Sequence, residues 1–149
     1  MKLAYEITSN DDPEKIEGYV IPIIGYGLWD AIYGYLAVKP NGNTIIGTAW
    51  YEHKETPGLG AIISAASWTK QFPGKELFLK DADKKTAPLG ITVVRGKVSE
   101  TLGDSPKASS AVDGIAGATL TGNGVTKAYK ETLAPYRPFF IRLQQQTGA

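Results

Sequence analysis

Two threonines in a glycine-rich stretch carry hydroxyl groups that could do chemistry. The stretch reads DGIAGATLTGNGV over residues 113–125 and places Thr119 and Thr121 two positions apart. A helix that begins here leaves unpaired backbone N–H groups and a partial positive charge at its first turn, which favours a bound phosphate. The same residues fit an ordinary helix entrance with Thr121 or Asn123 as the cap. No Gly-Lys-Ser/Thr follows the glycines, so the stretch is not a nucleoside-triphosphate loop.

A second loop, ETPGLGA over residues 55–61, has the composition of a ligand-contacting turn. The Pro57–Gly58 turn leads to Gly60, so backbone N–H groups could lie against a flat ligand. A plain β-turn between a strand and a helix has the same features, because this Gly-x-Gly lacks a third glycine. By itself the loop does not choose between the two interpretations.

The cysteine, histidine and charge counts exclude several function classes. The chain has no cysteine, which excludes disulfides and thiolate sites, and its one histidine, His53, excludes multi-histidine metal sites. A hydrolase that uses His53 would need a serine and a carboxylate nearby, and no Gly-x-Ser-x-Gly motif is present. We expect no metal site. Lys and Arg total 16 against 15 Asp and Glu, a net charge of +1, so we expect no nucleic-acid partner.

The elements that position these loops read mainly as strands. Strand patterns occupy five segments: 14–24, 27–38, 41–53, 76–79 and 88–98. The turn KPNGN predicts a hairpin between the second and third segments. Along 27–38, one side carries Leu28, Ile32, Leu36 and Val38. The apolar run over 19–38 is long enough to imitate a membrane span, but its proline and glycines favour strands.

Helical patterns follow in the second half. SAASWTKQFPGKE over 64–76 predicts a short helix capped by Ser64 or Ser67. A longer helix ending at Pro135 is indicated by apolar side chains on one face: Val125, Ala128, Tyr129, Thr132 and Leu133. PYRPFFIRLQQQ predicts a final short helix that packs Phe139 and Phe140 on the sheet. SETLGDSPKASSAVDG, over 99–114, is expected to lack regular structure.

These patterns together predict one domain over residues 1–149. Its fold class is α+β, with a largely antiparallel twisted sheet flanked by a few helices. Most aromatic residues, among them Trp29, Trp50, Trp68 and the tyrosines, are expected to build the core of that domain.

Four motifs in order resemble those of the C-subunit family of sodium-translocating NADH:quinone oxidoreductases: GYGLW, NGNTIIGTAWYEHKETPGLGA, W…QFPGKEL and DGIAGATLTGNGV. The chain is similar, more distantly, to the G subunit of the Rnf electron-transport complex. The resemblance runs from about residue 19 to residue 140 and implies an FMN-binding domain. It also implies that FMN is attached through a phosphoester to the hydroxyl of Thr119, by a separate transferase that uses FAD and magnesium.

The same resemblance implies the site residues. The family's attachment motif matches at Asp113, Gly117, Ala118 and Thr119, while Ala116 replaces its serine or threonine. Thr121 is the neighbouring threonine, and the resemblance favours Thr119 over it through the match at GAT. The flavin-contacting positions correspond to residues of two loops: Trp29, Thr56, Gly58, Leu59 and Gly60, with Leu28 and Gly27 as the adjoining wall. No side chain of the protein is expected to be catalytic, because the flavin itself exchanges electrons.

The resemblance also implies location and partners. The domain would be an electron carrier among other subunits of a complex in the bacterial inner membrane, on the periplasmic side. The family's N-terminal transmembrane helix is missing from this chain, so any membrane attachment is expected through that helix. Two alternatives remain, an Rnf-type flavin domain and a module that binds flavin or another flat ligand without a covalent bond.

Overall fold

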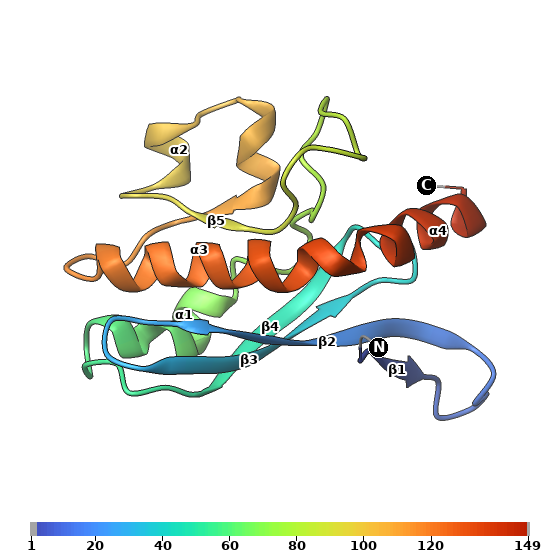
Figure 1. Ribbon diagram of the computed structural model, residues 1–149, viewed down its shortest axis with the longest axis horizontal. Helices are drawn as coiled ribbons and strands as arrows, with labels where there is room; N and C mark the ends of the chain where they lie inside the picture. The colour runs from blue at the N-terminus through green and yellow to red at the C-terminus, as the bar shows by residue number, and fades with distance from the viewer. Residues whose placement is uncertain (1–2, 149) are drawn as a thin grey trace.

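A four-stranded antiparallel sheet is the largest element of the fold, as the computed structural model of residues 3–148 shows (Figure 1). Its order follows the chain: β1 (Tyr5–Thr8), β2 (Ile16–Tyr26), β3 (Ala31–Val38) and β4 (Ile45–Glu52). Ile32, Leu36 and Val38 are buried on one face of β3, as their alternation predicts. The antiparallel sheet of an α+β fold is confirmed, and β1 is a strand that the sequence patterns did not indicate.

The predicted hairpin between β3 and β4 is present. Gly42 has a φ of 70°, which a glycine adopts without strain. The side-chain oxygen of Asn41 accepts hydrogen bonds from the backbone N–H groups of Asn43 and Thr44, each at 2.9 Å. The turn is therefore held by its own side chain as well as by the strands.

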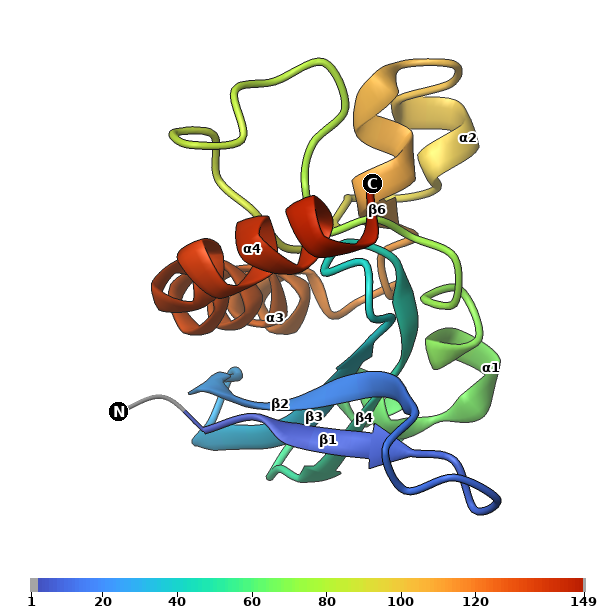
Figure 2. The ribbon, with the colours of Figure 1, turned by 90° about the vertical axis from the view of Figure 1, so that its right-hand side faces the viewer.

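Helices cover one face of the sheet in a second layer (Figures 1 and 2). Helix α3 (Thr119–Leu133) lies along β2, and α4 (Arg137–Thr147) continues it after a 3-10 turn over Ala134–Tyr136. The side chains predicted to face inward from α3 are buried, except Thr132, which is half-buried. The predicted packing of the final helix on the sheet is confirmed for Phe139, whose ring meets Tyr19 of β2 edge-on at a centroid distance of 5.1 Å, while the buried Phe140 packs on Phe78 and Tyr136.

A third layer lies above α3 (Figures 1 and 2). It includes most of residues 99–114, which were expected to lack regular structure. It contains the short helix α2 (Val98–Thr101), a 3-10 helix over Pro106–Ser110, and two paired strands, β5 (Thr92–Val93) and β6 (Ala111–Val112). The prediction was wrong because β6 forms by parallel pairing with a distant segment, which no local pattern records. The pair is also the one parallel pairing among the strands of residues 3–148.

The segment 76–79 forms no strand, contrary to expectation. It makes two isolated bridges, Glu76 with Thr44 and Phe78 with Leu89. Two of its backbone N–H groups are taken by the hairpin turn, since Leu77 donates to the Asn43 carbonyl and Phe78 to the Asn43 side chain, both at 2.9 Å, and the Glu76 N–H donates to the Ser109 carbonyl. Of the predicted strand over 88–98, only β5 is a strand.

The short helix predicted over 64–76 is present but shorter and capped differently. Helix α1 (Ala66–Thr69) follows a 3-10 helix over Gly60–Ser64, and its N-cap is Ala65, without a side-chain hydrogen bond. The Ser64 hydroxyl donates to the Ala61 carbonyl instead. The expectation of a serine cap was wrong because Ser64 belongs to the preceding 3-10 helix and its hydroxyl is bonded within that helix.

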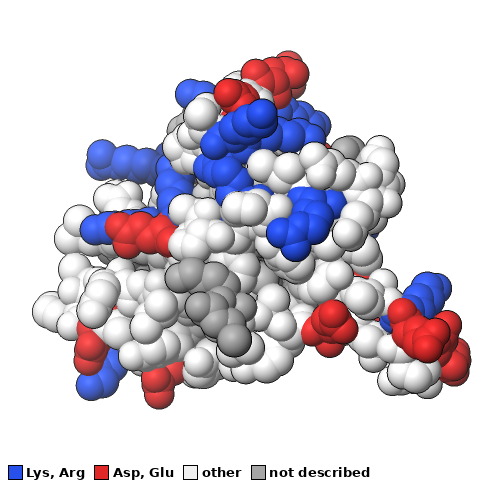
Figure 3. All heavy atoms as spheres, turned by 45° about the vertical axis from the view of Figure 1, so that its right-hand side comes forward, with Lys and Arg blue, Asp and Glu red and all other residues white. Residues whose placement is uncertain are grey.

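Charge is distributed in both signs over the surface. In Figure 3, Lys and Arg side chains gather over the upper part of the visible face, and Asp and Glu side chains lie mainly at its edges and on the projecting end. No helix among residues 3–148 has both the length and the apolar composition needed to cross a membrane.

Candidate functional site

Three loops meet at the end of the molecule where α3 begins, at the left of Figure 1. They are the β2–β3 loop at 27–30, the loop that follows β4, and the glycine-rich stretch before α3. Together they line a cleft of about 310 Å³ whose walls are Leu28, Trp29, Glu55, Thr56, Leu59, Gly60 and residues 117–121. The structure thus brings together nearly all the residues that the two glycine-containing motifs indicated.

Thr119 is the first residue of α3, and its side chain is exposed at the edge of this cleft. Ala118, at the N-cap position, provides no side-chain hydrogen bond, and the first helical bond runs from the Gly122 N–H to the Ala118 carbonyl. The N–H groups of residues 119–121 precede that bond and have no helical partner. An exposed hydroxyl therefore sits on an uncapped helix end.

Thr121 has a different environment, although it is only two residues away. Its side chain is 2% exposed, and its hydroxyl donates to Glu55 Oε1 at 2.6 Å. Thr121 and Asn123 both lie inside α3, so the expectation that one of them caps the helix was wrong. The helix begins earlier because glycines 122 and 124 are accommodated within it by close packing, with Gly122 against Val93 and Gly124 against Tyr26.

Glu55 is the site residue that sequence reasoning missed. It is 6% exposed, and its two carboxylate oxygens accept the Leu28 N–H at 3.1 and 3.2 Å in addition to the Thr121 hydroxyl. One carboxylate thus joins all three loops of the cleft. The available signal was a charged residue directly before a glycine-containing loop, but its partners lie 27 and 66 positions away.

Two glycines are required around this carboxylate. A Cβ on Gly27 would lie 2.6 Å from Glu55 Oε2, and a Cβ on Gly60 would lie 2.7 Å from Thr121 Oγ1. Both distances are shorter than real Cβ contacts. Gly27 and Gly60 are therefore needed for close approach, which is one of the roles expected for glycine near a site.

Apolar side chains form the rim of the cleft. Trp29 is 68% exposed, and Leu28, Leu59 and Leu120 are exposed beside it. The indole N–H of Trp29 reaches the Thr56 hydroxyl at 3.4 Å. Contrary to the predicted strand over 27–38, Leu28 and Trp29 lie in the loop before β3, so Leu28 is not in the core.

An ion pair links the two rim loops from outside. Lys54 Nζ and Asp30 Oδ2 are 3.1 Å apart, and both side chains are largely exposed. The backbone N–H of Ala31, with a further contribution from Lys54, lowers the pKa of Asp30. Exposed pairs of this kind stabilise little, so the buried Glu55 network is the main connection between the loops.

Three predicted site residues do not line the cleft: Gly27, which lies behind the Glu55 carboxylate, Gly58 and Asp113. Gly58 lies in the adjacent turn with a φ of 77° and nothing near its Cβ position. The Asp113 carboxylate accepts the Val98 N–H at 2.9 Å, and the Asp113 carbonyl accepts the indole N–H of Trp68 at 2.9 Å. Asp113 therefore ties the start of the glycine-rich stretch to α1 and α2.

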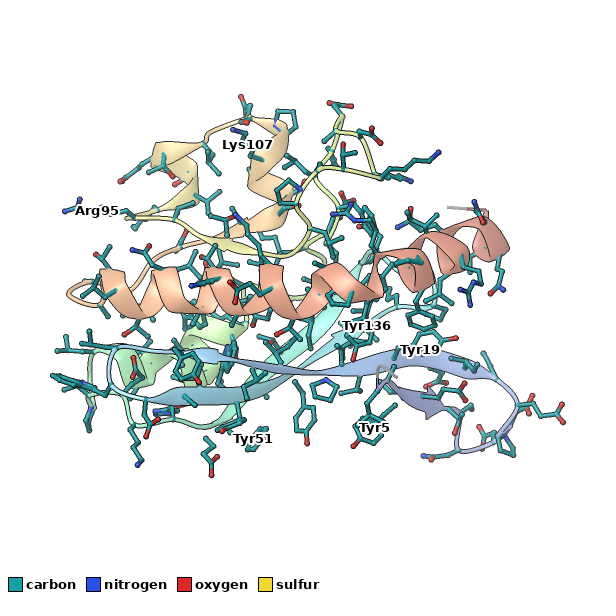
Figure 4. All side chains as sticks on the ribbon, viewed as in Figure 1. Tyr5, Tyr19, Tyr51, Arg95, Lys107 and Tyr136 are labelled. Atoms are coloured by element: carbon teal, nitrogen blue, oxygen red, sulfur yellow. The ribbon has the colours of Figure 1, made fainter. Side chains whose placement is uncertain are left out.

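A second, larger cleft of about 560 Å³ lies on the other side of the glycine-rich stretch that precedes α3. It shares residues 117–119 with the first cleft, and Arg95 and Lys97 are among its lining residues. Figure 4 shows the Arg95 side chain extending outward at the end of the molecule where α3 begins. Thr119 thus lies between an apolar cleft and a more basic one.

The arrangement around His53 does not resemble a catalytic triad. Its Nδ1 accepts the Glu55 N–H at 3.2 Å, and its Nε2 lies 3.2 Å from the Ser64 hydroxyl. A serine–histidine mechanism requires a carboxylate that orients the imidazole ring. Here the two ring nitrogens contact a backbone N–H and a serine hydroxyl instead. Trp50 and Trp68 are buried in the core, as expected, whereas Trp29 is exposed because it lies in the loop before β3.

Comparison with known proteins identifies the family of this chain. The sequence model of the FMN-binding domain family matches residues 27–134, a range that includes both rim loops and all of α3. The chain belongs to this family. FMN is therefore the ligand expected of this domain.

Proteins named as the C subunit of Na⁺-translocating NADH-quinone reductase are similar to this FMN-binding domain. The relative from Chlamydia caviae is 54% identical over 87% of this chain and 42% of its own length, and that from Vibrio parahaemolyticus is 38% identical over 95% and 50%. The crystal structure of Shewanella oneidensis NqrC superimposes with a TM-score of 0.77 at 35% identity, covering 95% of this chain and 60% of that one. The chain spans about half the length of the curated relatives it matches.

Proposed function

We propose that this chain is the electron-carrying flavin domain from the C subunit of a Na⁺-translocating NADH:quinone reductase, with FMN bound covalently to Thr119. The observation that carries the covalent step is the contrast between the two threonines. Thr119 presents an exposed hydroxyl on the first turn of α3, whereas the Thr121 hydroxyl is buried against Glu55. Only the first is open to an incoming phosphate without unfolding the helix end.

The apolar cleft suits the ring of the flavin. Leu28, Trp29 and Leu59 offer apolar surface, and a polar ring edge would face the backbone of Thr56 and Gly60. At about 310 Å³ the cleft is at the small end of ligand pockets, which span roughly 300–1,000 Å³. One edge of the ring would remain uncovered, as electron exchange with a partner requires. The bound flavin supplies the redox chemistry, and the protein binds and orients it.

The phosphate end has its own support. A phosphoester on Thr119 would lie at the uncapped N-terminus of α3, where unpaired N–H groups and the helix dipole favour an anion. Arg95 and Lys97 line the adjoining cleft and add positive charge on that side. Gly117, with a φ of 75°, and Ala118 form the turn that delivers Thr119 to this position.

A separate flavin transferase, which uses FAD and magnesium, is the proposed source of the bond. A threonine hydroxyl is a weak nucleophile without an adjacent base. Glu55, the buried carboxylate of the cleft, is already engaged by Thr121 and Leu28. Self-attachment is therefore disfavoured, and the exposed position of Thr119 is what an outside enzyme needs.

The setting of the domain is proposed from the relatives. Their names make them subunits of a Na⁺-translocating reductase, so we propose the other subunits of that complex as electron partners and the periplasmic side of the inner membrane as the location. Membrane attachment would use the N-terminal helix of the parent family. An Rnf-type complex is the alternative setting.

A second candidate function is a module that binds flavin or another flat ligand without a covalent bond. It is favoured by Ala116, which is exposed in the attachment loop where the family's motif carries serine or threonine. This module would form no adduct even with an active transferase.

The test is the intact mass of the denatured protein after co-expression with a flavin transferase, followed by peptide mapping. We expect a mass gain equal to FMN minus water, located at Thr119 and abolished by Thr119→Ala. Thr86→Ala, which changes another exposed threonine, is the matched control and should keep the full adduct. If this chain stays unmodified while the same transferase modifies a known acceptor protein, the result would favour the non-covalent module.

A further inference from the structure

The Glu55 carboxylate is buried without a cationic partner. The ion pairs among residues 3–148 are Lys54 with Asp30 and Lys127 with Glu131, and neither includes Glu55. Its partners are instead the Leu28 N–H and the Thr121 hydroxyl. Burying a carboxylate without a cation costs free energy, so its presence beside the cleft needs an explanation.

Hydrogen bonding alone does not require a negative charge here. Oε1 accepts from both the Leu28 N–H at 3.1 Å and the Thr121 hydroxyl at 2.6 Å. The carbonyl oxygen of a glutamine could accept both of these bonds while remaining neutral, and only the longer contact of the Leu28 N–H with Oε2, at 3.2 Å, would be lost to the amide group. What glutamate adds over glutamine is the charge, and Glu55 is one of the residues that line the cleft.

We propose that Glu55 is a positioning residue that holds a negative charge against the FMN cleft and thereby lowers the reduction potential of the bound flavin. Reduction adds negative charge to a flavin ring, and a fixed carboxylate in a poorly solvated site disfavours that change. The same hydrogen bonds keep the three loops in register around the ring. This inference rests on the proposed function in one respect, that FMN occupies the cleft.

The test compares the midpoint potential of bound FMN in the wild-type chain, in Glu55→Gln and in Glu52→Gln. Glu52 is an exposed carboxylate at the end of β4 and serves as the matched control. We expect Glu55→Gln to shift the potential in the positive direction by at least the equivalent of a tenfold change in the reduced-to-oxidised ratio, about 59 mV for one electron. Glu52→Gln should leave it near the wild-type value.

A third variant separates the charge from the packing. Thr121→Val removes the hydroxyl that contacts Glu55 but keeps the carboxylate, so it disturbs the loops without removing charge. The potential of this variant should not rise. Equal positive shifts in Thr121→Val and Glu55→Gln would mean that loop geometry sets the potential, and an unshifted Glu55→Gln would also overturn the inference.

Folding and attachment are controlled separately. If Glu55→Gln does not fold, the charge is removed instead in the double variant Glu55→Gln/Thr121→Val, in which the glutamine amide has no Thr121 hydroxyl to pair with. Its potential is then compared with that of Thr121→Val. The potential is measured on whichever form of FMN the wild type holds, attached or dissociable. Absence of an adduct would therefore count against the proposed function while the charge effect is still measured.

Discussion

Thr119 and Thr121 differ in what their hydroxyl groups can reach. The Thr121 hydroxyl donates a hydrogen bond to Glu55 Oε1 at 2.6 Å, whereas the Thr119 hydroxyl is exposed at the start of the helix. The motif resemblance favoured Thr119, whereas the residues alone left both threonines open. The choice depends on where α3 begins and on a carboxylate 66 positions away, so local spacing could not make it.

At Ala116 we predict that a serine increases the rate of flavin attachment. Ala116 is exposed three residues before Thr119, and a hydroxyl there would supply the group that the family's motif carries. One added hydrogen bond to the transferase complex, of about 1 kcal/mol, corresponds to roughly fivefold in rate. The time course of adduct formation by intact mass measures this. Ala116→Val, which adds bulk without a hydroxyl, should give no increase, and an equal gain in both variants would contradict the prediction.

Helix α3 can lie close to β2 because glycines occupy the contact. A Cβ on Gly25 would overlap Ala128, and a Cβ on Gly124 would overlap the Tyr26 carbonyl. The Thr132 hydroxyl also donates to the Ile24 carbonyl at 3.1 Å. The helix–sheet contact therefore fixes both the end of β2 and the loop that follows it, which carries Leu28 and Trp29.

Replacing Gly124 by alanine is predicted to lower stability and weaken flavin binding. Alanine gains about 1 kcal/mol of helix propensity, but overpacking against the backbone of β2 costs about 1–3 kcal/mol and moves the adjoining loop. Urea unfolding and titration with FMN measure the two effects. Gly47→Ala, at a strand glycine with open space around it, should change the free energy of unfolding by about 0.5 kcal/mol or less. Unchanged stability in Gly124→Ala would contradict the close contact.

The whole molecule is held by a core that joins the sheet, α1 and α3. Tyr129 of α3 is fully buried, with its ring 5.5 Å from Trp50 and 5.9 Å from Phe72. Its hydroxyl lies 2.8 Å from the Thr48 hydroxyl. Burial raises the pKa of Tyr129 well above its ordinary value, because the ionised form cannot be solvated there.

This pKa shift predicts loss of stability in alkali. A folded-state pKa above the unfolded value of 10.0 means that the native state keeps its proton as the unfolded state loses its own. The contribution is therefore complete below about pH 10 and declines as the pH rises further. Tyr129→Phe should cost about 1 kcal/mol at pH 8 and flatten the decline above pH 10, as urea unfolding at several pH values would measure.

The flattening should be partial, because burial also raises the pKa values of Tyr19 and Tyr136. Tyr26→Phe, at an exposed tyrosine, is the control and should leave the decline unchanged. A wild-type decline that persists in full in Tyr129→Phe would show that other groups cause it.

The sequence by itself determined the features that local patterns record. The alternation in β3 and the apolar face of α3 each reflect one buried side, and the Asn-Gly hairpin reflects the local conformation of its turn. The four ordered motifs indicated the flavin-binding family. Only the tertiary structure decided the pairing of β5 with β6, the position of Leu28 and Trp29 in a loop, and the role of Glu55. The physical reason is that each of these depends on hydrogen bonds or packing between distant segments, which exist only after the chain has folded.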